Sequence, residues 1–551
     1  MMNRFYKQFA AICVVILFMI YNVQPDLFAA TGKVNVRETH QTMDGFGASI
    51  AWYENTLVNH PKKDDIYYYI FEELGLDILR LRNTYRNNAI GSAQQFSAIV
   101  QNMYSYSSEE PKLMISSWSP PSNLKSNNSV NGGNNATLKK DPTTGKYVYG
   151  EFAKYWIDAL KAYKSIGIEP DFISIQNEPS YDASWESCRF EATETGYIAG
   201  YDRALDSVYY ALQQANLTTK LVGPEVHGIG YNTFQNYARR FNHDHLDVYA
   251  YHLYHGESDN VNDNHNPDLF IPNLSTIAKN YPGKPIWQTE FDRGDWLNTV
   301  WLMHNCLVHG NVSVYLYWSL VWGSGGKPLV EMQSNDFILT DYYWAFRQYS
   351  KFISAGWKRV TATVDAANLK ISAFINPEGN QLTVVIVNVG TQNEQMSFDI
   401  PDFNITNGAI IRTSDNEEGD EISNNYDGKS DIDFPARSIT TLTFSGQATG
   451  VRVEELSSPS EFLLCQNYPN PFNPSTTIGY SLHKSSKVKV TIFNMLGAKV
   501  RTLVDSFQSC GEYSVVWDAK DDQNNSVTTG IYFYRLETDG MNLQKKMILV
   551  R

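Results

Sequence analysis

The segments Ser-Ile-Gln-Asn-Glu-Pro at residues 174–179 and Lys-Pro-Ile-Trp-Gln-Thr-Glu at residues 284–290 follow the same pattern. Each is a short, largely apolar run that leads to a glutamate, Glu178 in the first segment and Glu290 in the second. A parallel strand of a β/α barrel presents a side chain in this way at its C-terminal end, where the active sites of such barrels lie. The two segments therefore predict two barrel strands whose glutamates meet at one mouth.

Around these segments, strand-like runs alternate with amphipathic stretches from residue 33 to about residue 352. The strand-like runs are residues 78–81, 113–116, 172–175, 220–222, 248–251, 285–287 and 312–317. Residues 152–166 and 195–215 instead carry apolar side chains at helical spacing. This alternation is typical of a parallel sheet with helical crossovers, and it predicts an α/β fold in which residues 46–355 form a (β/α)8 TIM barrel.

The pattern changes after the barrel. Short alternating strands are predicted at residues 371–375, 382–389, 395–400, 409–413 and 440–444. They predict a β-sandwich side domain over residues 356–446. Residues 447–460 are rich in Glu, Ser, Pro and Gly, which is typical of a linker. Residues 461–551 contain several turns between short strands, so we expect a small C-terminal all-β (Ig-like) domain there.

The two glutamates carry a specific chemistry if they lie close together, because such a pair is what retaining glycoside hydrolysis requires. One carboxyl must be protonated to donate to the leaving oxygen, and the other must be ionised to attack the anomeric carbon. Either glutamate alone could be a solvated strand end. Asn177, directly before Glu178, adds an amide that can hydrogen-bond a sugar hydroxyl beside the scissile bond. Together these residues indicate a retaining glycosidase.

The composition is that of a well-buried protein with more than one domain. The chain has 551 residues, and a barrel of about 250 residues leaves room for two smaller modules. Its 12 Trp and 35 Tyr provide rings that can stack on sugars, although most aromatic residues lie in the core. The net charge of −14 argues against nucleic acid or an anionic membrane as the main partner. No residue spacing resembles a metal site, and we expect neither a metal nor an organic cofactor.

Residues 1–30 are predicted to be a secretory signal peptide. Arg4 and Lys7 precede an apolar run at residues 9–21, and Ala29 and Ala30 offer a cleavage site. A membrane anchor is the alternative, but the run is only about a dozen residues long, whereas a spanning helix needs about 20. We therefore expect export and removal of this segment.

Export leaves four cysteines, which are Cys188, Cys306, Cys465 and Cys510. In an oxidising compartment four cysteines allow two disulfides and three connectivities. We expect a bond between Cys465 and Cys510 in the last module. Cys188 and Cys306 are expected to be small buried hydrophobic residues.

A series of short motifs resembles glycoside hydrolase family 30, and most closely its xylanase-like branch. The motifs stand, in order, at residues 41–49, 75–80, 117–121, 177–179, 223–225, 252–254, 287–290 and 348–353. The resemblance covers roughly residues 33–446, and it implies that residues 31–45 add an N-terminal strand to the β-sandwich. It also implies that Glu178 is the acid/base on a fourth strand and Glu290 the nucleophile on a seventh.

The resemblance assigns further residues to the site. Arg80 is implied to hydrogen-bond the nucleophile, and a surface ion pair is the alternative. His252 and Tyr254 are implied to support the sugar and the nucleophile, and a buried, satisfied histidine is the alternative for His252. The other substrate-binding or supporting residues are Asn177, Trp118 and Trp318 as floor aromatics, Tyr181 as a stacking ring, and Trp287. Glu225 is expected to buttress the wall and stays outside the catalytic pair.

One departure from the family concerns the substrate. Members that require a glucuronic acid branch carry arginines after the eighth strand, where this chain has Val321 and Trp322. Neither residue offers charge to a branch carboxylate, and Lys327 is the alternative cation. We expect a secreted, monomeric, retaining endo-β-1,4-xylanase that acts on xylan without depending on glucuronic acid branches. The alternatives are a glucuronoxylanase, a β-1,6-glucanase, a β-glycosidase, or a non-catalytic polysaccharide-binding surface protein.

The last module has its own resemblance. Residues 466–474, 513–518, 530–536 and 545–551 are similar to the type A sorting domain of the type IX secretion system. This similarity implies a Gram-negative bacterium whose type IX machinery recognises residues 461–551. It also implies export across both membranes, to the cell surface or the medium. A carbohydrate-binding module is the alternative, because Tyr and Trp side chains in this region can stack on sugars.

Overall fold

The computed structural model describes residues 29–449, apart from 108–109 and 257–265, and residues 463–550, apart from 465–466, 468–469, 471, 483–485, 509–510 and 539–540. The chain divides into two compact units, Met1–Thr449 and Gly450–Arg551, and each is considered by itself. The predicted signal peptide, most of the predicted linker, and both Cys465 and Cys510 lie outside the described residues.

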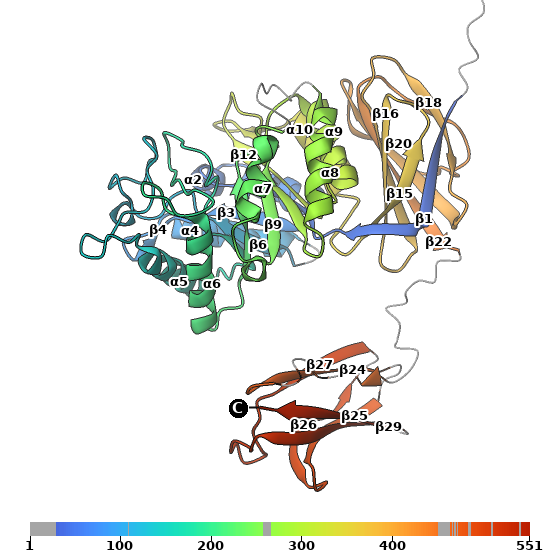
Figure 1. The fold of residues 1–551 in the computed structure, drawn as a ribbon. Coiled ribbons are helices and arrows are strands. Elements are labelled where there is room, and N and C mark those ends of the chain that lie inside the picture. Colours follow the sequence, from blue (N-terminus) through green and yellow to red (C-terminus); the bar gives the residue numbers. More distant parts are fainter. Residues whose placement is uncertain are drawn as a thin grey trace, which may run out of the picture. The chain divides into compact units, whose positions relative to one another are not determined.

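Eight parallel strands of the first unit close into a barrel, which confirms the predicted fold class (Figure 1). In chain order they are β2 (Gly45–Ile50), β3 (Ile78–Arg82), β6 (Lys112–Ser116), β7 (Phe172–Ser174), β8 (Lys220–Val226), β9 (Val248–His252), β10 (Ile286–Glu290) and β11 (Val314–Tyr317). The last strand, β11, pairs with β2 and closes the ring. Their side chains are almost all buried, as expected for parallel strands that have helices on one side and the barrel interior on the other.

Helices connect the strands. The longer ones are α4 (Ala93–Tyr106), α5 (Tyr149–Ser165), α6 (Tyr201–Gln214), α8 (Ile271–Asn280), α9 (Trp296–His309) and α10 (Asp341–Ser350). Shorter ones are α2 (Glu54–Val58), α3 (Lys63–Tyr67), η1 (Tyr68–Glu73), η2 (Ser122–Leu124), η3 (Gly230–Asn232), α7 (Thr233–Ala238), η4 (His243–His245) and η6 (Pro267–Phe270). In α6 the buried residues Leu205, Val208 and Leu212 recur at helical spacing and form the face that packs on the barrel.

The barrel interior is filled by apolar side chains from all around the ring. They are Ile78, Met114, Phe172, Val222, Val248, Ala250, Trp287, Val314 and Leu316. Trp287 packs edge-on against Phe172 with 4.6 Å between ring centroids, and its indole N–H donates to an Asp44 carboxylate oxygen at 3.2 Å. The predicted site residue Trp287 is therefore a core residue of the barrel.

The β-sandwich contains the N-terminal strand β1 (Ala30–Thr42) among strands from the end of the unit (Figure 1). The hydrogen-bonded order is β20-β19-β22-β17-β16-β15-β1-β18-β21. The other bounds are β15 (Lys358–Val364), β16 (Leu369–Ile375), β17 (Gln381–Asn388), β18 (Glu394–Asp399), β19 (Phe403–Ser414), β20 (Glu417–Ser423), β21 (Ile432–Phe434) and β22 (Ser438–Ala448). Helices α9 and α10 pack against this sheet, so α9 is buried around most of its circumference.

Two small sheets lie in loops of the first unit. The strands β4 (Tyr85–Arg86) and β5 (Ala89–Ile90) form a short hairpin after β3. The strands β12 (Val321–Trp322), β13 (Val330–Met332) and β14 (Phe337–Leu339) form a three-stranded sheet after β11. Both lie in loops that follow barrel strands at their C-terminal ends, where they shape the mouth of the barrel.

The second unit is all-β, as predicted. One sheet has the order β23 (Leu463–Leu464), β24 (Thr476–Leu482) and β27 (Gly511–Trp517). The other has the order β26 (Lys499–Gln508), β25 (Ser486–Asn494), β28 (Gly530–Thr538) and β29 (Met541–Leu549). Trp517, Ile492 and Tyr534 lie in a buried core within this unit.

Two further observations concern the described residues. Cys188 and Cys306 are free and buried, in line with the expectation that they serve as small hydrophobic residues. Among the helices that the structure describes, none is long and apolar enough to cross a membrane.

Candidate active site

A cavity of about 730 Å³ opens at the C-terminal ends of the barrel strands. Its walls are formed by Trp52, Tyr53, Trp118, Asn131, Glu178, Tyr181, Trp185, Glu186, His227, Tyr254, Glu290, Asp292, Arg293, Trp318 and Trp322. Glu178 follows the fourth barrel strand, β7, and Glu290 ends the seventh, β10. The cavity therefore lies where a β/α barrel builds its active site.

Local irregularities in the backbone aim several of these side chains. The pairing of β10 with β9 shifts register between Gln288 and Glu290, and that of β8 with β9 shifts between Pro224 and Val226. Such irregularities turn a side chain away from the regular alternation of a strand. Glu178 and Glu225 also have left-handed backbone conformations, with φ of 48° and 49°. Non-glycine residues seldom adopt this conformation, and it is concentrated at functional sites.

Arg80 on β3 organises the floor of the site, and it is fully buried with 0% of its surface exposed. Its Nη1 donates to Glu290 Oε2 at 2.7 Å, and its Nη2 donates to Asn177 Oδ1 at 2.6 Å and lies 3.1 Å from Glu225 Oε1. Its Nε donates to Ser116 Oγ at 3.0 Å, and that hydroxyl donates to Glu225 Oε2. The planar guanidinium thus fixes two carboxylates and the amide before Glu178 in one geometry.

The two glutamates face each other across a short gap. Tyr254 donates its hydroxyl to Glu290 Oε1 at 3.0 Å, so both oxygens of Glu290 are held. One oxygen of Glu178, one ring nitrogen of His252 and one oxygen of Glu290 all lie within 4.8 Å of one another. Retaining glycosidases hold their two carboxyl groups about 5–5.5 Å apart, whereas inverting ones need roughly 6.5–9.5 Å. The spacing fits a retaining pair.

Two histidines contact Glu178. His227 Nδ1 lies 2.8 Å and His252 Nδ1 lies 3.0 Å from the same oxygen, Glu178 Oε1. His252 is fully buried, and its Nε2 lies 3.8 Å from Glu225 Oε1. His252 therefore stands between two carboxylates, with Glu290 close by.

These contacts shift the pKa values of the site residues. Burial alone would raise the pKa of Glu178, but hydrogen bonds from His227 and His252 outweigh it and hold the pKa below its ordinary value. Burial raises the pKa of Glu290 despite the opposing charges of His252 and Arg80. Although burial opposes it, the surrounding carboxylates, Glu290 foremost, raise the pKa of His252 to about 9. Burial, with the charge of Glu290, raises the pKa of Asp292 to about 7.

The same residues could be considered as metal ligands, because Glu178, His252 and Glu290 converge. Their environment does not suit a cation. Arg80 already binds Glu290, and His227 and His252 both lie within hydrogen-bonding distance of Glu178. The positive charge that a metal would bring is thus already provided by side chains.

One wall of the cavity consists of four tryptophans in contact. Trp52 lies 5.3 Å from Trp118, 5.6 Å from Trp318 and 6.3 Å from Trp322, measured between ring centroids. The Arg80 guanidinium lies 4.7 Å from the centroid of the Trp118 ring. Because Arg80 also binds Glu290, this aromatic wall borders that carboxylate.

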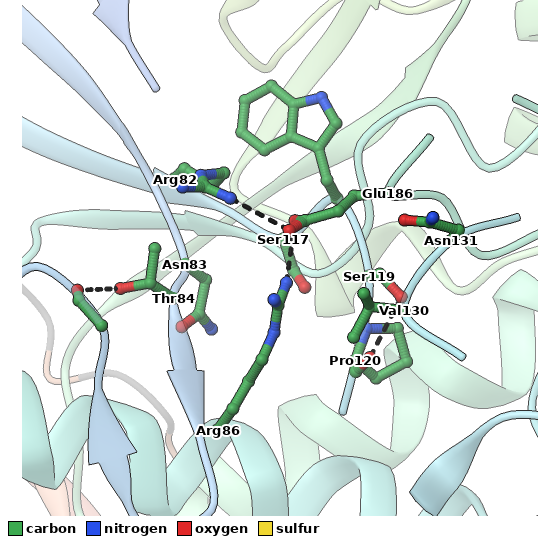
Figure 2. A network of polar contacts seen from close by, with 12 residues as sticks. Arg82, Asn83, Thr84, Arg86, Ser117, Ser119, Pro120, Val130, Asn131 and Glu186 are labelled. Atoms are coloured by element: carbon green, nitrogen blue, oxygen red, sulfur yellow. Dashed lines mark hydrogen bonds and ion pairs between the residues drawn. The ribbon is translucent and has the colours of Figure 1, made fainter. Parts of the chain in front are cut away.

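A group of ion pairs next to this wall contacts it through Trp52, and Figure 2 shows the ion pairs. Arg82 Nη1 and Arg86 Nη2 both pair with the Glu186 carboxylate, at 3.1 and 2.8 Å. The Arg82 guanidinium also stacks on Trp52 at 4.8 Å, and its Nε donates to the carbonyl of Ala51 at 2.8 Å. Glu186 lines the cavity, so this ion pair links the loop after β7 to the loop after β3.

The structure brings most of the predicted site residues together. Glu178, Glu290, Arg80, Trp118, Asn177, Tyr181, His252, Tyr254 and Trp318 all lie at or directly beneath the cavity. Trp287 does not lie there. Val321 is buried with 1% of its surface exposed, Trp322 joins the aromatic wall, and Lys327 Nζ donates to the carbonyl of Gly294 at 2.5 Å. Arg293, stacked 4.9 Å above Tyr254, lines the cavity instead.

Sequence reasoning missed several lining residues, which are Trp52, Tyr53, Asn131, Trp185, Glu186, His227, Asp292 and Arg293. Most lie in loops, where no hydrophobic period marks them. Three had a usable signal. His227 follows β8 directly, and Trp52 and Asp292 follow β2 and β10 by two residues. Their distance from a barrel strand end already places them at the mouth.

Comparisons with known proteins agree with this geometry. Residues 92–206 match the model described as Glycosyl hydrolase family 30 TIM-barrel domain, and residues 356–442 match the Glycosyl hydrolase family 30 beta sandwich domain. Residues 474–540 match the FlgD Ig-like domain. No sorting-domain match accompanies the Ig-like one, so the predicted sorting role stays a prediction.

Three relatives illustrate the range of similar proteins. Glucuronoxylanase XynC of Bacillus subtilis (strain 168) is 24% identical over 400 residues, which cover 68% of this chain and 81% of the relative. Endo-1,6-beta-D-glucanase BGN16.3 of Trichoderma harzianum is 25% identical over 304 residues, or 50% of this chain and 58% of the relative. The solved glycoside hydrolase family 30 subfamily 8 xylanase from Clostridium acetobutylicum shares the fold, with a TM-score of 0.60, 22% identity, and coverage of 75% of this chain and 99% of that one.

Proposed function

We propose that this glycoside hydrolase of family 30 is an exported, retaining endo-β-1,4-xylanase. The single observation that carries the proposal is the pair Glu178 and Glu290. Their oxygens lie within 4.8 Å of each other, with Glu178 after the fourth barrel strand and Glu290 at the end of the seventh, and Arg80 and Tyr254 donate hydrogen bonds to Glu290. The xylanase-like motifs of the sequence support xylan as the substrate, as does the similarity to a glucuronoxylanase.

The residues suggest a two-step reaction. Glu178 donates its proton to the glycosidic oxygen while the Glu290 carboxylate attacks the anomeric carbon, so the aglycone leaves as an alcohol and a glycosyl ester forms on Glu290. Glu178, now a carboxylate, then takes a proton from water as the water oxygen attacks the same carbon. Glu290 is released as a carboxylate and Glu178 is protonated again, which restores the starting state.

Catalysis requires a protonated Glu178 and an ionised Glu290. Without substrate, the hydrogen bonds on Glu178 lower its pKa and burial raises the pKa of Glu290. We expect bound substrate to oppose both shifts. The positive charge that develops at the anomeric carbon favours an ionised Glu290, which Arg80 and Tyr254 already hold in position.

We also propose that hydrolysis does not depend on glucuronic acid branches of the xylan. A glucuronic acid carboxylate gains no charged contact from Val321 or Trp322. These residues therefore give the enzyme no binding energy that would make its activity depend on that branch. A β-1,6-glucanase is the second candidate, favoured by the match to a Trichoderma harzianum protein of that name. A third is a glucuronoxylanase that uses Arg293, whose guanidinium lines the cavity.

The test is hydrolysis of a panel of glucuronoxylan, xylan without glucuronate and β-1,6-glucan by the mature chain. We expect reducing ends from both xylans, β-anomers first by proton NMR, and kcat/KM values within about tenfold of each other. Release from the glucan alone would assign the second candidate. A preference for glucuronoxylan above about tenfold would assign the third, because one charged contact is worth roughly 1.5–3 kcal/mol.

The roles of the two glutamates are tested separately. Glu178→Ala should lose most activity on polysaccharide, where general acid help contributes about 10²–10⁴-fold, but should retain turnover of aryl glycosides whose leaving groups need no proton. Glu290→Ala should lose both activities. Equal loss on both substrates in Glu178→Ala would move the acid/base label elsewhere.

The proposal extends to export. We propose that residues 461–551 direct the chain through the type IX secretion machinery, because their closing motifs resemble its type A sorting domain. Deletion of residues 461–551 should leave xylan hydrolysis intact but abolish surface delivery in a host with this system. Normal delivery together with lost binding to insoluble xylan would instead identify a carbohydrate-binding module.

A further inference from the structure

His227 lies next to Glu178 in the site, but the proposed two-step reaction assigns it no role. It follows β8 directly, and its ring lies between two tyrosine rings, 4.3 Å from Tyr181 at 11° and 5.0 Å from Tyr254 at 25°. Its backbone is also held, because its N–H donates to Ser180 Oγ at 3.2 Å and its carbonyl accepts from the N–H of Tyr254 at 3.1 Å. The imidazole is thus fixed in orientation.

The fixed ring is aimed at one atom. His227 Nδ1 lies 2.8 Å from Glu178 Oε1, the same oxygen that His252 Nδ1 meets at 3.0 Å. The other oxygen, Oε2, takes no hydrogen bond from any residue that the structure describes. Because two imidazoles hold Oε1, the carboxyl group cannot rotate freely, and Oε2 is the oxygen left to meet a glycosidic oxygen.

We propose that His227 is a positioning residue for general acid catalysis, in that it orients the carboxyl group of Glu178 and stabilises the carboxylate formed when the proton is transferred. The inference rests on the proposed role of Glu178 as acid/base. In the first step the proton passes from Glu178 to the leaving oxygen, and in the second it returns from water. His227 donates a hydrogen bond to Glu178 Oε1 throughout both steps.

The electrostatic surroundings agree with this role. The hydrogen bond from His227 is the largest of the influences that lower the pKa of Glu178 against burial, and that from His252 is the next. The titratable groups that face His227 are Glu178 from the loop after β7, Tyr181 from the same loop, and Tyr254 and His255 from the loop after β9, with His255 at 5.5 Å between ring centroids. Glu178 shares a hydrogen bond with the imidazole, at 2.8 Å from Nδ1.

Two variants of the full mature chain separate the hydrogen bond from the packing. His227→Phe keeps an aromatic ring between Tyr181 and Tyr254 but has no donor, whereas His227→Asn has a shorter side chain whose amide can place a donor near the position of Nδ1. The substrates are a series of aryl β-glycosides of the sugar that the wild-type enzyme releases, with leaving groups of rising basicity.

We expect His227→Phe to lose about tenfold or more in kcat on basic leaving groups, a part of the roughly 10²–10⁴-fold that general acid help provides, and to change little on the most acidic ones. The basic limb of its kcat/KM profile should move to higher pH, because the carboxylate has lost a stabilising donor. His227→Asn should recover most of both properties. A profile of His227→Phe that coincides with wild type, or equal loss across the leaving-group series, would overturn the proposal.

A measurement without substrate keeps the test independent of the activity. Carbon NMR of protein labelled at the glutamate carboxyls, with Glu178→Gln to assign the resonance, follows the titration of Glu178 directly. We expect it to titrate at higher pH in His227→Phe than in wild type, and no difference would overturn the proposal. If Glu178→Ala retains full activity, the proposed function itself fails. If Glu178→Ala is impaired but His227→Phe matches wild type, only the role of His227 fails.

Discussion

At the scale of single residues, Arg80 determines the geometry of the site. It contacts Glu290, Glu225, Asn177 and Ser116 from a fully buried position. An arginine is required there because a planar fork with five donors can satisfy partners that lie on different sides. A buried cation of this kind stabilises the fold weakly in itself, but its removal leaves Glu290 and Glu225 without the guanidinium that binds them both.

Arg80→Lys should therefore be a damaging substitution, although it keeps the charge. An ammonium group cannot reach Glu290 and Asn177 in the same geometry, and each lost charge-assisted hydrogen bond is worth about 1.5–3 kcal/mol. We expect kcat/KM to fall by roughly ten- to a hundredfold or more. Arg37→Lys, at an exposed pair with Asp402, is the matched control and should leave activity unchanged. Similar kinetics in both variants would contradict the central role of Arg80.

His252 makes stability depend on pH with a definite sign. Its pKa is raised from 6.5 to about 9 in the folded protein, so the folded state binds this proton more tightly than the unfolded state. The stability it contributes is fully present below pH 6.5 and is lost as the pH rises to about 9. We expect urea unfolding to show a falling free energy over this window, and His252→Gln to flatten the fall. An equal slope in both proteins would contradict the prediction.

The residues of the site were predicted from sequence to different degrees. Glu178, Glu290 and Arg80 could be named because each stands at the end of an apolar run, which places it at a barrel mouth. Trp287 shares that neighbourhood in sequence, but its side chain points into the barrel, which a linear motif does not reveal. Glu186 could not be found, because its role depends on Arg82 and Arg86, which lie in another part of the sequence.

At the scale of elements, the strands were predicted well where apolar runs were continuous. The run at residues 113–116 is β6 (Lys112–Ser116), and that at residues 248–251 is β9. The strand predicted at residues 220–222 was too short, because β8 continues to Val226. Gly223 and Pro224 interrupt the apolar pattern and concealed the rest of the strand. The loops between strands, which carry most of the specificity, have no periodicity from which to predict them.

One buried lysine orders two of these loops. Lys125 is fully buried, and its ammonium donates to the carbonyls of Val130 at 3.0 Å and Asn131 at 2.9 Å, as well as to that of Ser187. Asn131 lines the cavity, and Ser187 follows Glu186, which also lines it. The lysine therefore joins two segments of the cavity wall from behind.

Lys125→Met should loosen that wall. The substitution leaves three carbonyls without their donor, which destabilises the fold, but it also removes a buried charge, which offsets part of that loss. We expect the free energy of unfolding to fall by about 1–3 kcal/mol as the net result. The Michaelis constant should rise more than kcat falls, because the wall binds substrate without taking part in the reaction. Lys164→Met, which removes an exposed pair with Glu169, serves as the control. Urea unfolding and steady-state kinetics check both expectations, and an unchanged Michaelis constant would contradict them.

At the scale of the whole molecule, the chain consists of two units with separate hydrophobic cores. The barrel and the β-sandwich share the first unit, where α9 and α10 pack against the sheet. Continuous apolar runs between helical stretches predicted the barrel, and short alternating strands predicted the β-sandwich. The second unit has its own buried tryptophan, Trp517, among strands that alternate clearly.

The two units should therefore unfold independently. We expect a chain that ends at residue 449 to retain the unfolding midpoint and the kcat of the longer chain, because its core draws on no residue beyond that point. Calorimetry of the longer chain should equal the sum of the traces of the two separate units. A lower midpoint for the shortened chain would reveal stabilisation by the second unit.

The position of β1 has a consequence for the order of folding. Gly32 pairs with Val364 and Thr31 with Ser397, so the first strand finds its neighbours only after more than three hundred residues have been made. Closing so long a loop is entropically costly, and contacts of such high sequence separation form slowly. Until they form, β1 remains an unpaired edge that can associate with other chains. A newly made chain is consequently most prone to aggregate before residues 358–399 have been synthesised. Slowing translation at that stage should lower the yield of native protein.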